Sequence, residues 1–179
     1  MYSYFQKMKG SEKSPNMVSS DEFLWSFIGS FIGIAALYYI HFDFVAAMDL
    51  NLMIGSFGAS AVLVFGAIGG PLSQPRNLIG GHIVSAIIGV FCYQLFPQQL
   101  WLASALAVSS AIAAMHLTKT LHPPGGATAL IAVIGSPKLH SIGYLYAIFP
   151  VARGALMLLI IALLVNNVSS KRQYPKYWW

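Results

Sequence analysis

Long apolar stretches with almost no charge limit the fold of this chain more than any other feature. A helix needs about 20 mostly apolar residues to cross the hydrocarbon core of a bilayer. A composition of 57% hydrophobic and 8% charged residues is foreign to soluble domains. We therefore predict an all-α integral membrane protein, a compact helical bundle of about six segments. The apolar stretches span residues 23–42, 50–70, 78–96, 100–118, 125–135 and 142–168.

Three of these stretches depart from a simple crossing helix. The stretch 125–135 has about half of the length that a crossing needs, and the stretch 50–70 begins with the glycine-rich sequence "NLMIGSFGAS". Pro150 and Arg153 lie inside the stretch 142–168, so a kink or break is expected near "IFPVARG". We therefore expect two short or interrupted helices and one broken helix in the bundle.

Basic residues near the two ends of the chain predict its orientation. Lysines precede the first apolar stretch, and Lys171, Arg172 and Lys176 follow the last one. Because cytoplasmic loops are enriched in Lys and Arg, both termini are expected in the cytoplasm, which needs an even number of crossings. Six crossings leave only Lys138 among the basic loop residues outside. The N-terminus does not resemble a secretory signal, so the expected location is a bacterial plasma (inner) membrane.

The sequence also predicts three parts along the chain. Residues 1–22 are expected to form a cytoplasmic N-terminal segment, 23–168 the transmembrane domain, and 169–179 a basic and aromatic cytoplasmic tail. Ser20 or Asp21 is expected to cap the first helix, because the oxygens of such side chains accept hydrogen bonds from the free N–H groups of a first turn.

The transmembrane domain contains an internal repeat. The sequence "FGASAVLVFGAIGGP" at 57–71 resembles "GGATALIAVIGSP" at 125–137. The two copies lie three apolar stretches apart, so one would run inward and the other outward, and 23–97 and 98–168 would form an inverted repeat. The matched positions are Gly58, Ala59, Ser60 and Ala61 in the first copy and Gly126, Ala127, Thr128 and Ala129 in the second.

Paired short helices interrupted by glycine or proline are typical of a binding site near the membrane midplane of a transporter. In "HPPGG", the histidine and prolines would be extended backbone entering the membrane, and the helix would start at the glycines. The positive N-termini of the two short helices would then face each other and attract an anion. Close packing of small residues between helices is the alternative. The expected substrate-binding residues are Gly58, Ser60, Gly125, Gly126 and Thr128.

The distribution of reactive side chains agrees with an anion site and argues against other classes. From residue 50 to the C-terminus the chain has no Asp or Glu, whereas a cation pathway or a carboxylate proton relay needs acids within the membrane. The histidines lack a metal-ligand spacing such as HxxxH, and Cys92 is the single cysteine. We therefore expect no metal, cofactor or catalytic residue, and neither an enzyme nor a nucleic-acid-binding protein.

Three motifs resemble a known family. "HPPGGATAL", "GSFGASAVLVF" and "PLSQPRNLIGGH" are similar to sequences of the HPP family of small bacterial and chloroplast membrane proteins, and the resemblance covers residues 20–168. Members from cyanobacteria and chloroplasts are associated with nitrite transport, so the resemblance implies an anion transporter or channel with nitrite as the leading substrate. It also implies importance for the namesake motif at residues 122–126. Descriptions of the family often count four spans rather than six.

Five polar residues are candidates for the pathway or its gate. His122 can serve as a proton-linked gate near neutral pH, or as an anchor for the entering chain. Arg76 can recruit the anion or contact lipid headgroups, and Asn77 can cap a helix. His82 either lines the pathway or is a buried, hydrogen-bonded histidine. Arg153 is expected to meet backbone carbonyls, water or the anion, or to extend towards the membrane surface.

These features together predict a transporter or channel for a small monovalent anion, with nitrite first, bound between the two short helices near the membrane midplane. The alternative is an anion-responsive membrane sensor or scaffold that does not transport. The expected partners are a small inorganic anion and the lipid bilayer. Faces of small residues allow a homo-oligomer without requiring one.

Overall fold

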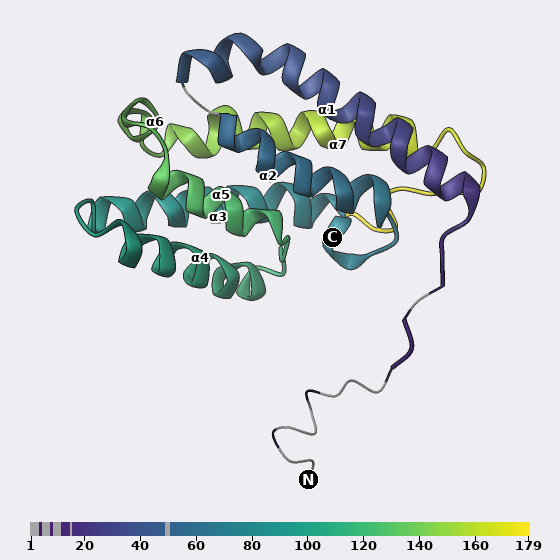
Figure 1. Ribbon diagram of the computed structural model, residues 1–179, viewed down its shortest axis with the longest axis horizontal. Helices are drawn as coiled ribbons and strands as arrows, with labels where there is room; N and C mark the ends of the chain where they lie inside the picture. Colours follow the sequence, from purple (N-terminus) through teal and green to yellow (C-terminus); the bar gives the residue numbers. More distant parts are fainter. Residues whose placement is uncertain (1–3, 5–7, 9–11, 15, 49–50) are drawn as a thin grey trace.

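The structure is a computed structural model that describes the chain except for residues 1–3, 5–7, 9–11, 15, 49 and 50. Every regular element in the described part is a helix (Figure 1). The predicted segment 1–22 and the start of the stretch 50–70 lie partly outside the described residues. The main helices are α1 (Ser20–Met48), α2 (Asn51–Ala61), α3 (Pro75–Leu95), α4 (Leu100–Leu117), α5 (Pro124–Ile134), α6 (Pro137–Ile142) and α7 (Arg153–Asn166), with the π-helical segments η2 (Val62–Gly66) and η4 (Ala147–Ala152) and the 3₁₀ turn η3 (Pro71–Ser73).

The helix lengths agree with a helical membrane protein. Among the described residues, four helices are long and apolar enough to cross a membrane, and two further apolar helices are shorter. The short ones, Gly55–Gly66 and Pro124–Ile134, are the two that the sequence predicts to be short or interrupted. The four long ones are Ser20–Ile40, Pro75–Leu95, Leu100–Leu117 and Ala147–Asn166.

The long helices run between the two ends of the bundle (Figure 1). At one end, which we call the tail end, Arg172 Nη2 lies 3.2 Å from Glu22 Oε1 and donates to the carbonyl oxygen of Phe65 at 2.5 Å. At the other, the far end, the ring of His140 stacks on Tyr93 with centroids 3.6 Å apart. The start of α1 and the chain after α7 therefore lie at the same end. The tail end contains residues 20–22, 65–76, 118–122 and 167–179, and the far end contains 95–100 and 134–146.

α3, α4 and α5 pack against one another with very little side chain between their backbones. At Gly89 of α3, a Cβ atom would lie 2.4 Å from the carbonyl oxygen of Ala129 in α5. Small residues at such contacts let helix backbones approach closely, as membrane helices often do. The buried face of α4 has a fully buried residue at every fourth position, and the first three of these, Ala103, Ala107 and Ala111, are alanines.

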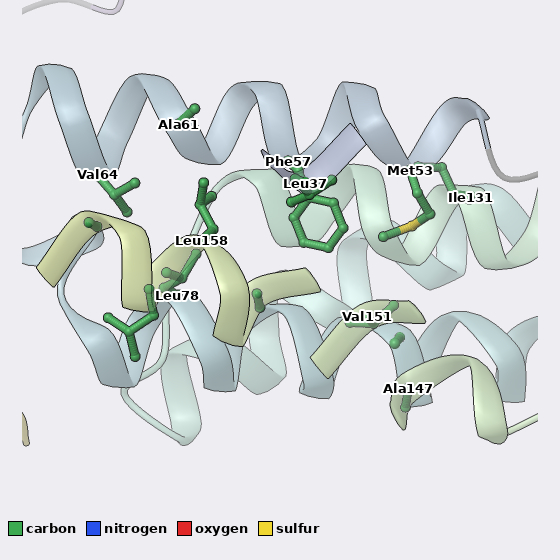
Figure 2. Close-up of a cluster of buried hydrophobic side chains, with 14 of the residues drawn as sticks. Leu37, Met53, Phe57, Ala61, Val64, Leu78, Ile131, Ala147, Val151 and Leu158 are labelled. Carbon is green, nitrogen blue, oxygen red and sulfur yellow. The ribbon is translucent and has the colours of Figure 1, made fainter. Parts of the chain in front are cut away.

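A second core lies between α2 and α7, with α1 and α3 beside them (Figure 2). Met53 and Phe57 of α2 and Leu158 of α7 are at most 2% exposed. Gly154 of α7 makes room for the ring of Phe57, because a Cβ atom there would lie 2.4 Å from Phe57 Cζ. Large side chains on α2 thus fit against a glycine on α7, which fixes how the short helix sits in the bundle.

α1 differs from the prediction at both of its ends. It continues to Met48, beyond its predicted end, because no glycine or proline follows Gly33 to interrupt it before that point. Ser19 Oγ accepts a hydrogen bond from the N–H group three residues later at 3.2 Å. Ser19 therefore caps the helix, and the prediction of Ser20 or Asp21 as the cap was wrong.

The two short helices run in opposite directions, as the repeat predicts, but they lie side by side with the N-terminus of α5 beside the later turns of α2, so the prediction that their N-termini face each other was wrong. Ser56 of α2 lies beside Pro124 at the start of α5, and Ser60, one turn later, lies beside His122, which precedes α5. Gly58 and Ser60 belong to the third turn of α2 instead of its beginning. Glycine lowers helix propensity without abolishing it, and a Cβ atom at Gly58 would meet nothing within 4 Å. The glycines of α2 therefore mark no helix start.

The second short helix and the last apolar stretch agree better with the sequence. α5 begins at Pro124, and Pro123 already has helical angles of φ −50° and ψ −39°. The prediction that both prolines are extended backbone and that the helix starts at the glycines was therefore wrong, because a proline fits the first turn of a helix, where its missing N–H group is not needed. In the last stretch, the non-helical Phe149 (φ −125°, ψ 112°) directly precedes Pro150. The break predicted near "IFPVARG" is confirmed.

Candidate functional site

His82 of α3 holds two hydroxyl groups that the internal repeat places at matched positions. Its Nε2 lies 2.8 Å from Ser60 Oγ of α2, and its Nδ1 lies 2.7 Å from Thr128 Oγ1 of α5. Ser60 and Thr128 are the matched pair of the two sequence copies. One imidazole ring therefore bridges the two short helices.

The hydrogen bonds continue from Ser60 towards the tail end. His122 Nε2 lies 2.9 Å from Ser60 Oγ, and His122 Nδ1 lies 2.8 Å from the carbonyl oxygen of Leu72. The ring centroids of His82 and His122 are 5.1 Å apart. Two imidazole rings thus share one serine hydroxyl.

The hydrogen bonds also continue from Thr128 in the other direction. Thr128 Oγ1 lies 2.8 Å from Ser56 Oγ, and Ser56 Oγ lies 2.9 Å from the carbonyl oxygen of Pro124. We call the whole set the histidine–hydroxyl chain. In order, its side chains are His122, Ser60, His82, Thr128 and Ser56, and it ends at the carbonyl groups of Leu72 and Pro124.

The histidine–hydroxyl chain is enclosed by protein, and no carboxylate lies beside it in the part of the protein that the structure describes. Its five side chains are at most 1% exposed. The ring of Phe57 lies 5.2 Å from that of His82, and Tyr146 Oη donates to the Thr128 carbonyl at 3.0 Å. No Asp or Glu occurs in α2, α3, α5 or α7. A charge that forms on the chain would therefore lack an acidic partner among the residues around it.

The carbonyl group of Leu72 determines where the hydrogens lie when the chain is neutral. A carbonyl only accepts, so His122 Nδ1 carries the hydrogen and His122 Nε2 accepts from the Ser60 hydroxyl. Ser60 has no second hydrogen and accepts from Nε2–H of His82, whose Nδ1 then accepts from Thr128. The hydrogen-bond partners thus assign different tautomers to the two histidines.

The surface of α3 lets the segment before α5 approach closely. A Cβ atom at Gly81 would lie 2.5 Å from His122 Cβ and 2.8 Å from the carbonyl oxygen of Thr120. Asn77 Nδ2 donates to the carbonyl oxygen of Leu121 at 2.8 Å. Gly81 and the Asn77 amide, both on α3, therefore hold the segment that carries His122 in place.

The predicted binding residues separate into two groups. Ser60 and Thr128 both belong to the histidine–hydroxyl chain, while the three glycines do not. Gly125 packs tightly, because a Cβ atom there would lie 2.6 Å from a serine hydroxyl of α3. At Gly126 the nearest atom to such a Cβ would be 3.8 Å away, and Gly58 faces a groove between α1 and α2. Gly125 thus has the packing role that the sequence left as the alternative.

Among the pathway candidates, His82 and His122 belong to the chain and three residues lie outside it. Asn77 is not a helix cap, because α3 already begins with the proline before Arg76. Arg76 lines a pocket of about 240 Å³ together with Trp178 and Trp179. Arg153 has an exposed side chain at the start of α7.

Sequence reasoning missed Ser56 and the two terminal carbonyl groups. Ser56 lies one helical turn before Ser60, and this spacing places both hydroxyls on one helix face. The signal for Ser56 was therefore present in the sequence. The Leu72 carbonyl had no such signal, because its position depends on how the loop between η2 and α3 folds.

Comparisons with known proteins agree with this architecture. The model of the HPP transmembrane region matches residues 15–175. Two relatives from Dictyostelium discoideum, both named as transmembrane proteins, are 49% identical over 179 residues and 43% identical over 185 residues, and each match covers 98% of this chain. The chain spans 57% and 63% of the lengths of these relatives. No solved structure matches it.

The comparisons and the helices agree on a membrane protein but not on its source. Both relatives come from Dictyostelium discoideum, so they lend no support to the expected bacterial membrane. The three quoted motifs, the apolar helices and the match over residues 15–175 lead to the same assignment. The chain belongs to the HPP family of transmembrane proteins.

Proposed function

We propose that this protein carries a small monovalent anion across a membrane. The observation that carries the proposal is the histidine–hydroxyl chain, a buried set of hydrogen-bonding groups between the two short helices, with no carboxylate beside it among the described residues. Buried polar groups inside membrane helices are costly and are most often functional. The absence of acids from α2, α3, α5 and α7 favours an anion over a cation.

The side chains can bind an anion only if the chain opens. The hydroxyls of Ser60 and Thr128 are both engaged with His82, so the structure corresponds to a closed site. An entering anion would accept hydrogen bonds from these hydroxyls and from the imidazole N–H in place of their contacts with one another. The positive N-terminal end of α5 lies beside Ser56 and adds a favourable field.

The proposed mechanism includes the inverted repeat of residues 23–97 and 98–168. In support, α1 packs on α7 and α4 packs on α3, the arrangement expected if the first helix of each repeat contacts the last helix of the other. The matched Ser60 and Thr128 meet at His82. The ion pair of Arg172 with Glu22 supports an even number of crossings, because it places the start of α1 and the tail 169–179 at the same end. The basic residues of the segment 1–22 and of the tail favour the cytoplasm as that side.

Nitrite is the substrate that we propose first, on the basis of the resemblance to HPP proteins associated with nitrite transport. Nitrite is small and monovalent, and its oxygens can accept hydrogen bonds from two hydroxyls at once. The two relatives are named only as transmembrane proteins, so this assignment rests on the resemblance and the chemistry of the site. The proposal includes no enzymatic step, metal or cofactor.

Anion uptake into liposomes containing the purified protein tests the proposal. We expect nitrite uptake above that of protein-free liposomes, with nitrate, formate and chloride as competitors. Thr128→Val keeps the shape of the side chain but removes a hydroxyl of the chain, and should reduce uptake at least about tenfold, the effect of losing one hydrogen bond to a charged group. Thr118→Val, which removes an exposed hydroxyl at the end of α4, is the matched control and should behave like the wild type.

Two results would contradict the proposal. Unchanged uptake by a folded Thr128→Val variant would exclude the histidine–hydroxyl chain as the binding site. No uptake of any anion by the folded wild type would exclude transport and favour the alternative, an anion-responsive sensor or scaffold.

A further inference from the structure

The histidine–hydroxyl chain has six short hydrogen-bond contacts, one more than its five hydrogens, and two longer contacts beside them, from Ser60 Oγ to the Ser56 carbonyl oxygen at 3.2 Å and from Thr128 Oγ1 to the Pro124 carbonyl oxygen at 3.4 Å. Contacts of 2.7–2.9 Å join the Leu72 carbonyl, the five side chains and the Pro124 carbonyl in sequence. Each side chain in its neutral form brings a single hydrogen, and the terminal carbonyls bring none. With the tautomers assigned above, the unfilled contact lies at Ser56, whose one hydrogen must serve both Thr128 and Pro124.

One added proton supplies a hydrogen for each of the six short contacts. If it resides on His82, both ring nitrogens donate, one to Ser60 and one to Thr128, and Thr128 and Ser56 turn to donate towards the Pro124 carbonyl. If it resides on His122, the ring donates to the Leu72 carbonyl and to Ser60, and the hydroxyl of Ser60 donates to His82 instead. Both arrangements satisfy all six of the short contacts.

The added proton can pass between the two rings through Ser60. The hydrogen on His82 Nε2 moves to Ser60 Oγ while the hydroxyl hydrogen of Ser60 moves to His122 Nε2, so one O–H and one N–H bond break and one of each forms. The heavy atoms are already within 2.9 Å of each other, so no side chain needs to be displaced. His122 is the ring nearest the tail end, where its Nδ1 meets the loop carbonyl of Leu72.

The groups around the histidine–hydroxyl chain allow one added proton, and they provide no negative charge to balance it. Two protonated rings would stand 5.1 Å apart. The titratable group that faces the chain from the segment before α7 is Tyr146, and the charged group on α3, Arg76, lies towards the tail end beside Thr120. Neither can neutralise an imidazolium, and α2, α3, α5 and α7 carry no acid. A bound monovalent anion would supply the missing negative charge.

We propose that the histidine–hydroxyl chain takes up one proton together with each anion, so that the protein moves both in the same direction at a ratio of one to one. This inference rests on the proposed transport function and deepens it. The proton comes from water on one side and returns to water on the other, and no other bond changes. The overall step is electrically neutral.

The experiment measures anion and proton entry in the same liposomes. The purified protein is reconstituted around a pH-sensitive dye, an inward nitrite gradient is applied, and potassium with valinomycin sets the membrane voltage. Protein-free liposomes correct for entry of undissociated nitrous acid. We expect one proton to enter with each nitrite, at a rate that voltage does not change. A voltage of about 100 mV would instead shift the equilibrium ratio of the inside to the outside concentration by about 50-fold for an anion that moves alone.

A variant connects the coupling to the chain. His122→Gln retains hydrogen-bonding groups but cannot take a proton, and we expect proton-coupled nitrite entry to fall at least about tenfold. His116→Gln replaces an exposed histidine of α4 and serves as the matched control. Coupled entry that stays normal in a folded His122→Gln variant would overturn the role of the chain.

The wild-type measurement separates failure of the inference from failure of the proposed function. Nitrite entry that follows the voltage and brings no proton would overturn proton coupling but leave anion transport intact. No entry of nitrite, nitrate, formate or chloride would overturn both. Neither result depends on whether a variant folds.

Discussion

At the scale of single residues, His82 organises the candidate site because both of its ring nitrogens have partners. The sequence indicated Ser60 and Thr128 through the repeat, but it left His82 undecided between a pathway residue and a buried, bonded histidine. The structure shows the bonded arrangement, with 2.8 Å and 2.7 Å contacts to the two hydroxyls. Helix periodicity tells which face a residue occupies, but not which side chain from another helix it meets.

The assigned tautomers can be measured directly. When both rings are neutral, we expect the hydrogen on Nδ1 of His122 and on Nε2 of His82. The Leu72 carbonyl accepts from His122 Nδ1, so the Ser60 hydroxyl must donate to His122 Nε2 and can only accept from His82 Nε2. Nitrogen-15 NMR of histidine-labelled protein distinguishes protonated from unprotonated ring nitrogens. Finding the hydrogen on Nδ1 of His82 at neutral charge would contradict the assigned order of hydrogen bonds.

Two adjacent glycines of α5 should respond in opposite ways to the same substitution. Gly125→Ala would bring a Cβ atom within 2.6 Å of the Ser85 hydroxyl and 2.9 Å of the Gly81 carbonyl oxygen, so we expect a loss of about 1–3 kcal/mol in unfolding free energy. Gly126→Ala has room and should be neutral or stabilising by about 0.5–1 kcal/mol, because alanine favours the helix. Unfolding of both variants in mixed detergent micelles gives the comparison. Equal effects would show that the contact at Gly125 is not tight.

At the scale of helices, the sequence predicted which segments are short but not how they are arranged. The length and apolar character of the stretches were enough for the four long helices and for α5. The prediction failed for α2, where Gly58 and its neighbours were interpreted as a helix start although Gly58 lies in the third turn. Glycine lowers the helix propensity of a segment but does not determine where the helix begins. The side-by-side contact of α2 with α5 depends on tertiary packing, which local propensity does not describe.

The ion pairs between α1 and the C-terminal tail are expected to differ in strength. Burial lowers the pKa of the Arg172 guanidinium, and the nearby Glu22 carboxylate opposes that effect. Glu22→Gln would leave the almost fully buried guanidinium without its counter-charge, so we expect a loss of about 1–2 kcal/mol in unfolding free energy. Asp21→Asn removes the exposed pair with Lys171 and should cost less than about 0.5 kcal/mol.

Chemical unfolding of these two variants beside the wild type provides the measurement. The difference between them should persist at high salt, because salt screens the exposed pair far more than the buried one. A larger loss for Asp21→Asn than for Glu22→Gln would contradict the burial of the Arg172 side chain.

At the scale of the whole molecule, the structure places the beginning and end of the bundle together, in agreement with the even number of crossings expected from the basic residues. In a background with the buried Cys92 replaced by alanine, single cysteines at exposed positions can report topology. Ser14→Cys and Ser170→Cys should react with a membrane-impermeant maleimide from the same side of sealed vesicles, and Ser141→Cys in α6 should react only from the opposite side. Labelling of Ser14→Cys and Ser141→Cys from one side and of Ser170→Cys from the other would show that α5 enters the membrane and returns.

The glycine contacts of α3 also bear on how the molecule can move. The backbones of α3 and α5 touch at Gly89, and a Cβ atom is excluded at Gly81 and Gly125. We therefore expect α3, α4 and α5 to move together as one rigid block. The neighbouring α2 is joined to this block by the hydrogen bonds of Ser56 and Ser60, which can be exchanged one by one for bonds to water or an anion. A movement that opens the site would then occur between α2 and the block of α3, α4 and α5. The gate and the binding site would therefore be formed by the same surface.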